Sequence, residues 1–287
     1  MFHSQYITFQ GACDVLLSNS PDGADGSPFR IHARLTAPAS SPDKNQKDSE
    51  KYTYISDVGL EIGPDYKFQV QSENAEVLLN DKHFTSAEED DDDESTNKVF
   101  PFTFSKEIKG QRKNIVAYTF TFANKSKIVI RSNTHFRMTF VELHGSFGNS
   151  SVSGLLGNPK TKGLFNRKGE LMSAHDVNAY GIEWQVRADE PKLFVNKDRF
   201  PQYPDKCVIV NSNENMTNLR GDKSSIGRRR LLAADDGDDV AEKNKLVQDA
   251  IKACSHLKGV GKEYCVDDII ATGEFELASD SFYAEMY

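Results

Sequence analysis

The sequence predicts a mainly β protein, an antiparallel β-sandwich followed by a small C-terminal helical hairpin. Up to about residue 143, apolar residues come in short runs rich in β-branched and aromatic side chains, which is typical of strands. Gly, Pro, Asn and Asp separate these runs, and no helical pattern lies between them. This favours antiparallel strands joined by short turns. After residue 240 the apolar spacing changes to three and four residues, which is the period of an amphipathic helix.

The apolar runs define the candidate strands. These are residues 6–9, 14–17, 29–35, 52–62, 66–70, 75–79, 100–108, 114–122, 127–131 and 136–143. The alternation is clearest in residues 114–122, because side chains alternate across a strand and every second residue here is apolar. The residues of that apolar face are Val116, Tyr118, Phe120 and Phe122. This strand is therefore expected to have one face in the core and the other toward solvent.

Changes of pattern along the chain predict three regions. Residues 1–190 are predicted to form the sandwich, residues 191–239 an extended linker that contains Cys207, and residues 240–287 a small disulfide-linked helical module. The linker is predicted because regular periodicity gives way to Pro, Asn, Ser and clustered charges.

The charge distribution disfavours several classes of partner. The formal net charge is −8, and acidic residues are concentrated, above all in residues 88–94. This run is expected to be a solvated loop, with weak calcium capture as the less favoured interpretation. Concentrated acid argues against nucleic acid or an anionic membrane surface as the main partner. No stretch approaches the ~20 apolar residues of a transmembrane helix, so no membrane span is expected in this chain.

The four cysteines are Cys13, Cys207, Cys254 and Cys265, which permit two disulfides in three connectivities. The first two predicted helical segments are residues 240–258 and 264–271, separated by a glycine turn. Two antiparallel helices at this spacing bring Cys254 and Cys265 within bonding reach. Closing so short a loop contributes about 2–3 kcal/mol, which matters for a small module. The cysteine and histidine spacings do not favour zinc.

Several stretches resemble a von Willebrand factor type D domain. They are residues 2–17, with an aromatic, Gly, Cys and an apolar strand; residues 29–34; residues 58–63 with the later 78–81; and Ser153-Gly154-Leu155-Leu156-Gly157-Asn158, in the place of the family's Cys-Gly-Leu-Cys-Gly-Asn. The resemblance covers residues 2 to about 186. It looks closest to a divergent group from algae and related microbes, with a reduced cysteine-rich helical tail, and it implies a von Willebrand type D-like sandwich.

The same resemblance bears on metal binding. Members of the family commonly hold calcium with an Asp of the opening motif and with Asn and Asp residues after the Gly-Asn. Here His3 replaces that Asp, and Asn158 is retained but is followed by Pro159 and Lys160. Calcium prefers six to eight oxygen ligands, several of them anionic, whereas Lys160 places an ammonium group where the family has a carboxylate. The calcium site is therefore expected to be lost, and no metal or cofactor is expected.

The cysteine pattern also departs from the family. Ser153 and Leu156 stand where the family has its paired cysteines, so disulfide exchange through that motif is not expected. Cys13 is expected to pair with Cys207, because the other pair is satisfied locally. Possible N-glycosylation sequons begin at Asn124, Asn149 and Asn215.

No motif in the sequence predicts an enzyme. There is no Gly-rich phosphate loop before a helix, no Gly-x-Ser-x-Gly elbow and no His-Glu-x-x-His helix. His135, His144 and His175 are interpreted as packed or surface residues, because none has a partner at a catalytic spacing. A hydrolase with a dispersed site is a third, less favoured interpretation.

Together these observations favour a non-catalytic extracellular or cell-surface module that serves in adhesion or matrix assembly, with the role resting on the resemblance. The expected partners are other extracellular proteins or matrix glycans. The alternative is a lipid-carrier-associated domain of the yolk-lipoprotein type. The expected location is secreted or at the cell surface, although the first residues lack the order of a signal peptide. A truncated start is one explanation of that conflict.

Overall fold

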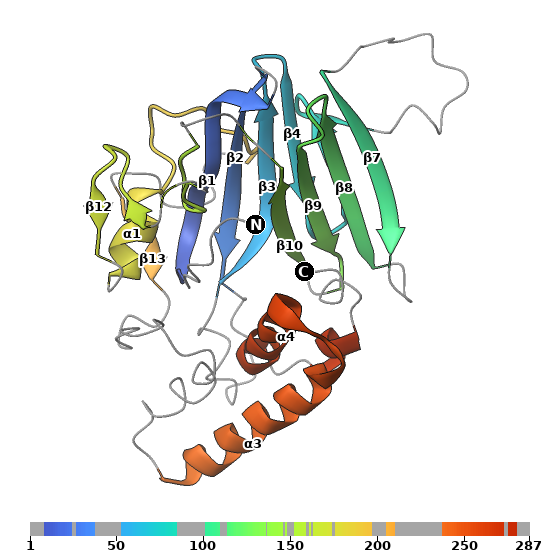
Figure 1. Ribbon diagram of the computed structural model, residues 1–287, viewed down its shortest axis with the longest axis vertical. Helices are drawn as coiled ribbons and strands as arrows, with labels where there is room; N and C mark the ends of the chain where they lie inside the picture. Colours follow the sequence, from blue (N-terminus) through green and yellow to red (C-terminus); the bar gives the residue numbers. More distant parts are fainter. Residues whose placement is uncertain are drawn as a thin grey trace. The chain divides into compact units, whose positions relative to one another are not determined.

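The computed structural model describes residues 9–24, 27–37, 53–84, 101–109, 114–135, 137–145, 147, 152–158, 161, 163–173, 176–196, 205–209, 237–272 and 275–279. This part of the chain is mainly β with antiparallel sheets, as the sequence predicts (Figure 1). It divides into two compact units. The first contains the described strands and helix α1, and the second contains helices α3 and α4.

The larger sheet is antiparallel, with the order β13-β1-β2-β3-β4-β5-β6. Its strands are β1 (Gly11–Ala24), β2 (Ser27–Thr36), β3 (Tyr54–Ile62), β4 (Tyr66–Gln71), β5 (Val77–Leu79), β6 (Lys82–His83) and β13 (Val208–Ile209). Apart from β13, neighbours in the sheet are also neighbours in sequence. Short turns join β3 to β4 and β5 to β6, whereas β2 and β3 are separated by 17 residues, most of which lie outside the described part. Strand β13 returns from far along the chain to pair with the start of β1.

The second sheet is antiparallel, with the order β10-β9-β8-β7. Its strands are β7 (Phe102–Lys109), β8 (Ile115–Phe122), β9 (Lys127–Asn133) and β10 (Met138–His144). A separate two-stranded sheet joins β11 (Leu164–Phe165) to β12 (Leu171–Met172).

One hydrophobic core receives side chains from both large sheets. Phe68 of β4 is fully buried, and its ring centroid lies 4.9 Å from that of Phe120 of β8 and 5.8 Å from that of Phe102 of β7. The predicted apolar face of residues 114–122 is confirmed. Its members Val116, Tyr118, Phe120 and Phe122 are all buried in this core. Edge-on aromatic contacts of this kind add to the area that the rings bury.

The motif at residues 153–158 packs directly against β1. Asn19 and Ser153 exchange two backbone hydrogen bonds, at 2.8 and 2.9 Å. Gly154 has a φ of +129°, and a Cβ at this position would lie 2.5 Å from the carbonyl oxygen of Leu17. Only glycine fits here, because both the backbone angle and the close approach exclude a side chain.

Residues 184–196 run from the edge of the larger sheet onto the face that points away from the core. Residues 184–186 pair with β1 through backbone hydrogen bonds, and residues 193–196 lie over that outer face. The segment follows helix α1 (Val177–Glu183), whose first turn is capped by the Asp176 carboxylate accepting from the Ala179 N–H at 2.8 Å. Leu193 is buried and lies against Gly59 of β3. The sheet is thus covered on both faces in this region.

The first compact unit continues past residue 190 and ends at Val210. Phe194 is buried, and β13 pairs with β1. The described residues at the start of the expected linker, 191–196 and 205–209, therefore belong to the unit that contains the sheets. Most of the remainder of 191–239 lies outside the described residues.

The second unit is a helical hairpin with a small core of its own. Its elements are α3 (Gly237–Ala253), the 3₁₀ turn η1 (Cys254–His256), α4 (Gly259–Thr272) and the 3₁₀ turn η2 (Phe275–Ser279). The buried side chains are Val247, Ala250, Cys254, Leu257, Cys265, Ile269, Leu277 and Ala278. The sequence predicts an apolar stripe of Leu246, Val247, Ala250, Ile251, Cys254 and Leu257 on the first helix. Of these, Val247, Ala250, Cys254 and Leu257 are buried, Leu246 is half-buried, and Ile251 is 38% exposed because it lies about 100° around the helix from Ala250.

Several element ends differ from those that the pattern predicts. Strand β5 begins at Val77 rather than residue 75, and β10 begins at Met138 rather than 136. In each case a residue with positive φ comes just before the strand, Ala75 at 51° and Arg137 at 54°, and this conformation interrupts extended backbone. Gly259 begins α4, whereas the sequence predicted it to end the preceding helix. The predicted strand at 6–9 lies almost entirely outside the described residues.

Candidate functional site

The candidate site is the face of the four-stranded sheet that points away from the core. Pairing aligns the outward residues of neighbouring strands in rows, so that Val129 of β9 is opposite Thr119 of β8 and Glu142 of β10. In the next row, Lys127 is opposite His144. Residues directly opposite each other in a sheet have Cβ atoms about 5 Å apart, so these side chains are neighbours.

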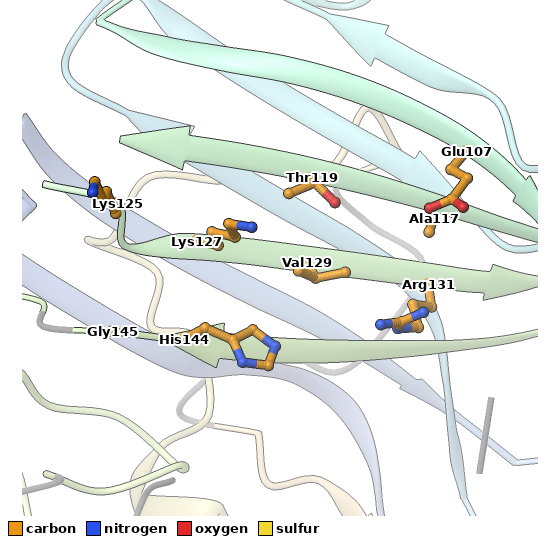
Figure 2. A pocket seen from close by; sticks show the side chains of 9 residues that line it. All are labelled: Glu107, Ala117, Thr119, Lys125, Lys127, Val129, Arg131, His144 and Gly145. Carbon is orange, nitrogen blue, oxygen red and sulfur yellow. The ribbon is translucent and has the colours of Figure 1, made fainter. Parts of the chain in front are cut away.

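A hollow of about 370 Å³ lies on this face. Its lining residues are Glu107, Ala117, Thr119, Lys125, Lys127, Val129, Arg131, His144 and Gly145. Ala117 and Val129 are buried although they point outward, and these small side chains alternate with longer ones along the strands. Figure 2 shows Lys127, Val129 and Arg131 along one strand, with Thr119 and His144 on the strands to either side. The hollow is shallow and open toward solvent, unlike the enclosed pockets that bury most of a small ligand.

The charges around the hollow are arranged asymmetrically. Arg131 Nε donates to Glu142 Oε1 at 2.8 Å, and His144 Nε2 lies 2.8 Å from Glu142 Oε2. Glu142 therefore holds both Arg131 and His144. Among the described residues, no carboxylate lies within ion-pair distance of the ammonium groups of Lys125 and Lys127. The end of the hollow formed by the two lysines thus carries unneutralised positive charge.

A strained turn positions Lys125. Asn124 Oδ1 accepts from the Ser126 N–H at 2.8 Å, and the Lys125 N–H donates to the Phe122 carbonyl at 2.9 Å. Lys125 has a φ of 67°, a left-handed conformation that costs a non-glycine residue about 1–2 kcal/mol. Glycine or asparagine is the usual choice there. The same left-handed backbone occurs at Ala75, Asn80, Asp81 and Arg137, so the conformation of Lys125 serves to direct its side chain from the turn to the end of the hollow.

The chemistry available in the hollow is recognition of an anionic, hydroxyl-rich molecule. Lys125 and Lys127 supply ammonium donors, the Thr119 hydroxyl both donates and accepts, and the Glu107 carboxylate accepts. The floor offers aliphatic surface from Ala117 and Val129.

A second polar network lies beneath residues 184–196. The Arg34 guanidinium is almost fully buried and donates to both carboxylate oxygens of Asp14, at 2.8 and 2.9 Å. It also donates to the Asn196 carbonyl at 2.7 Å and lies 4.3 Å from the ring centroid of Phe194. These bonds use the Nε and Nη2 donors of the guanidinium. Ion pairing and hydrogen bonding of this kind are what let a charged group be buried, so this network is interpreted as structural.

Arg167 organises the same region. Its guanidinium donates to the carbonyls of Glu183 and Gln185 at 2.9 Å, and it is paired with the Glu190 carboxylate. It lies 5.0 Å from the ring of Trp184, the single tryptophan of the chain. One side chain from the β11–β12 hairpin thus joins the end of α1 to two positions of the covering segment, residues 184–196.

His32 is the buried titratable group in this network. It lies on β2 and is 1% exposed. Burial, together with the positive charges of neighbouring Arg and Lys side chains, lowers the pKa of His32 from 6.5 to about 3. No hydrogen-bond partner of its Nε2 is found in the part of the chain that the structure describes.

The cysteines form two disulfides, and these are the two pairs expected from the sequence. Cys13 is bonded to Cys207 and Cys254 to Cys265, with Cα–Cα distances of 5.1 and 6.1 Å. Each of the four side chains is buried. The first bond joins positions 194 residues apart and holds β13 against β1.

The other predicted site residues are only partly described. Asn124 is exposed in the β8–β9 turn, and the Asn158 carbonyl accepts from the Thr161 N–H at 3.2 Å. His135 is exposed, and His144 belongs to the hollow. The residues outside the described part are His3, Asn149, Lys160, His175 and Asn215. The expected loss of the calcium site stays a prediction.

Two searches of the described residues gave negative results. They contain no group of three His, Cys, Asp or Glu side chains placed to hold a metal ion. None of the helices in this part of the chain combines the length and apolar character needed to cross a membrane.

The sequence did not identify the hollow. The alternation of Lys127, Val129 and Arg131 within a predicted strand was the available signal, because it places all three on one face. His144 was interpreted as a lone histidine, since its partner Glu142 is two residues away and adjacent only when both point outward. Comparisons with protein-family models, curated proteins and solved structures gave no match to this chain.

Proposed function

We propose that this chain is a non-catalytic extracellular or cell-surface binding module, of von Willebrand type D-like kind, that acts in adhesion or matrix assembly. The single observation that carries the proposal is the hollow on the four-stranded sheet, where Lys125 and Lys127 present unneutralised charge. Its polar lining is a feature of recognition. The resemblance of residues 2–186 to type D domains supports the adhesive role by analogy.

The disulfides support an extracellular location. Both bonds are buried, and bonds of this kind form and persist in oxidising compartments. The expected partners are other extracellular proteins or matrix glycans, which meet the module through this face.

The test is a binding screen of the full chain against immobilised extracellular proteins and glycans. The variant Lys125→Glu/Lys127→Glu should lose the binding that the unmodified chain shows. The matched control is Lys82→Glu/Lys168→Glu, which makes the same change of net charge at two exposed positions outside the hollow, and it should bind normally. Binding that both double variants retain would overturn the proposal, as would a signal found only with lipid vesicles, which would favour the lipid-carrier alternative.

A further inference from the structure

The hollow on the four-stranded sheet has features that define the class of its ligand. This step rests on the proposed function and names the molecule that the site takes. The relevant features are a line of charge along β9, saturated backbone hydrogen bonding beneath it, and a floor that is apolar in the middle and polar at the rim.

The positive charges lie in a line. Lys127 and Arg131 are both outward residues of β9 with Val129 between them, so their Cα atoms are about 14 Å apart along the strand. Lys125 extends the line into the turn (Figure 2). A line of this length fits a linear anion that carries several charges better than it fits a single small ion.

The backbone beneath the hollow has no free partners to offer. Strands β8 and β9 lie inside the sheet, and each is paired on both sides. Peptides in extended form are usually bound at sheet edges, where unpaired N–H and C=O groups receive them. A peptide lying on this face would leave its own backbone groups unpaired, which is costly when they lose water. The face therefore suits a ligand that has no peptide backbone and whose polar groups lie at its edges, where the polar side chains around the hollow can reach them.

The mixture of surfaces suits a sugar ring. Ala117 and Val129 provide aliphatic floor, while the Thr119 hydroxyl and the Glu107 carboxylate provide a donor and acceptors at the side. A pyranose ring has aliphatic C–H faces and hydroxyl groups at its edge, so it matches both. Arg131 is held in place by Glu142 at 2.8 Å, so its guanidinium is already ordered before a ligand arrives.

The surrounding charge makes the site selective. The chain as a whole has a net charge of −8, which repels polyanions elsewhere on its surface. The lysines of the hollow therefore form a local attraction on an acidic protein. We infer that the outer face of the four-stranded sheet binds an acidic polysaccharide, with Lys125, Lys127 and Arg131 contacting its anionic groups and with Val129 beneath a sugar ring.

The experiment is titration calorimetry of the full chain with a purified oligogalacturonate of defined length. The chain is made without N-glycosylation, because Asn124 adjoins Lys125. The neutral oligosaccharide of matched length, a sulfated oligosaccharide and poly-glutamate of equal charge serve as competing probes. Acidic oligosaccharides should bind and the neutral one should not.

The variants test the lysines. Lys127→Ala should weaken binding about threefold and Lys125→Glu/Lys127→Glu about tenfold or more, whereas Lys82→Glu/Lys168→Glu should not change it. Binding should weaken on raising the salt concentration.

Each other result contradicts the inference. Equal binding of poly-glutamate would show a general or peptide polyanion site, and equal binding of the neutral sugar would remove the role of charge. If no acidic oligosaccharide binds but the screen above finds a different ligand that depends on Lys125 and Lys127, the sugar inference fails and the binding module stands. If no ligand depends on the two lysines, both fail.

Circular dichroism of each variant verifies its fold. The variant Thr119→Val, which alters no charge, should weaken binding without altering the dependence of binding on salt.

Discussion

His32 is a titratable side chain placed where only its neutral form is stable. Its ring is buried beneath residues 184–196, and Arg30 on its own strand adds to the local positive charge. Among the described residues, no carboxylate lies within ion-pair distance of the ring to stabilise the charged form. At neutral pH the ring is uncharged, so no charge is buried, but the lowered pKa makes the folded state sensitive to acid.

The first prediction concerns this sensitivity. The pKa of His32 is about 3 in the folded chain and 6.5 in the unfolded chain, so below pH 6.5 the unfolded state binds a proton that the folded state does not. Stability should therefore fall as the pH decreases from 6.5 towards 3, by up to about 5 kcal/mol from this residue. The measurement is the free energy of urea unfolding at several pH values for the unmodified chain and for His32→Gln. The difference between the two should grow as the pH falls, and parallel pH curves would contradict the prediction.

Local pattern predicted part of the site at this scale. The shared face of Lys127, Val129 and Arg131 follows from strand periodicity alone. The contribution of Lys125 could not be predicted in this way. Its side-chain direction depends on a left-handed backbone conformation, which is usual for glycine or asparagine and is not expected for lysine. The buried pair of Arg34 and Asp14 was also missed, since its partners are 20 residues apart and charged residues are expected at the surface.

At the scale of single elements, periodicity located most strands and both long helices, and it failed at their ends. Strand β1 runs on from the predicted 14–17 to Ala24, through a polar stretch whose pairing to β2 is the stabilising interaction. Such pairing is tertiary information that local propensity does not contain. Helix α3 ends at Ala253 and is followed by the 3₁₀ turn η1, and α4 begins at Gly259. Gly259 was predicted to end the first helix, and it is instead the first residue of the second.

The second prediction concerns the helical hairpin. Its core is small, and the Cys254–Cys265 bond closes a loop of 11 residues between α3 and α4. The variant Cys254→Ala/Cys265→Ala should lower the stability of this unit by about 3 kcal/mol, because the unfolded segment regains loop entropy. Circular dichroism at 222 nm should then show helix melting before the strands. The control Cys13→Ala/Cys207→Ala should leave helix melting unchanged. Simultaneous loss of helix and strand signal in the first variant would show that the hairpin has no independent transition.

At the scale of the whole molecule, long-range contacts complete the first compact unit. Cys13 is joined to Cys207 across 194 residues, and residues 184–196 cover the face of a sheet built from the first third of the chain. The sequence predicted the disulfide by pairing the remaining cysteines. It could not predict the covering segment, because Leu193, Phe194 and Val195 form one short apolar run in a stretch without periodicity.

The third prediction concerns Arg167, whose planar guanidinium holds residues 184–196 in place. The guanidinium contacts the carbonyls of Glu183 and Gln185 and the carboxylate of Glu190 together, and a lysine keeps the charge but cannot reach all three. Arg167→Lys should therefore destabilise the segment by about 2–3 kcal/mol. Trp184 is the single tryptophan, is 3% exposed, and has its ring centroid 5.0 Å from the Arg167 guanidinium. It also packs in the main core, so its fluorescence reports unfolding of the first unit together with this contact. Its fluorescence should shift to longer wavelength at a lower urea concentration in the variant. The neighbouring exposed Lys168→Met is the control and should leave the midpoint in place. An unchanged tryptophan transition in Arg167→Lys would mean that the sheet retains its cover without this fork, and that Leu193 and Phe194 suffice to hold it.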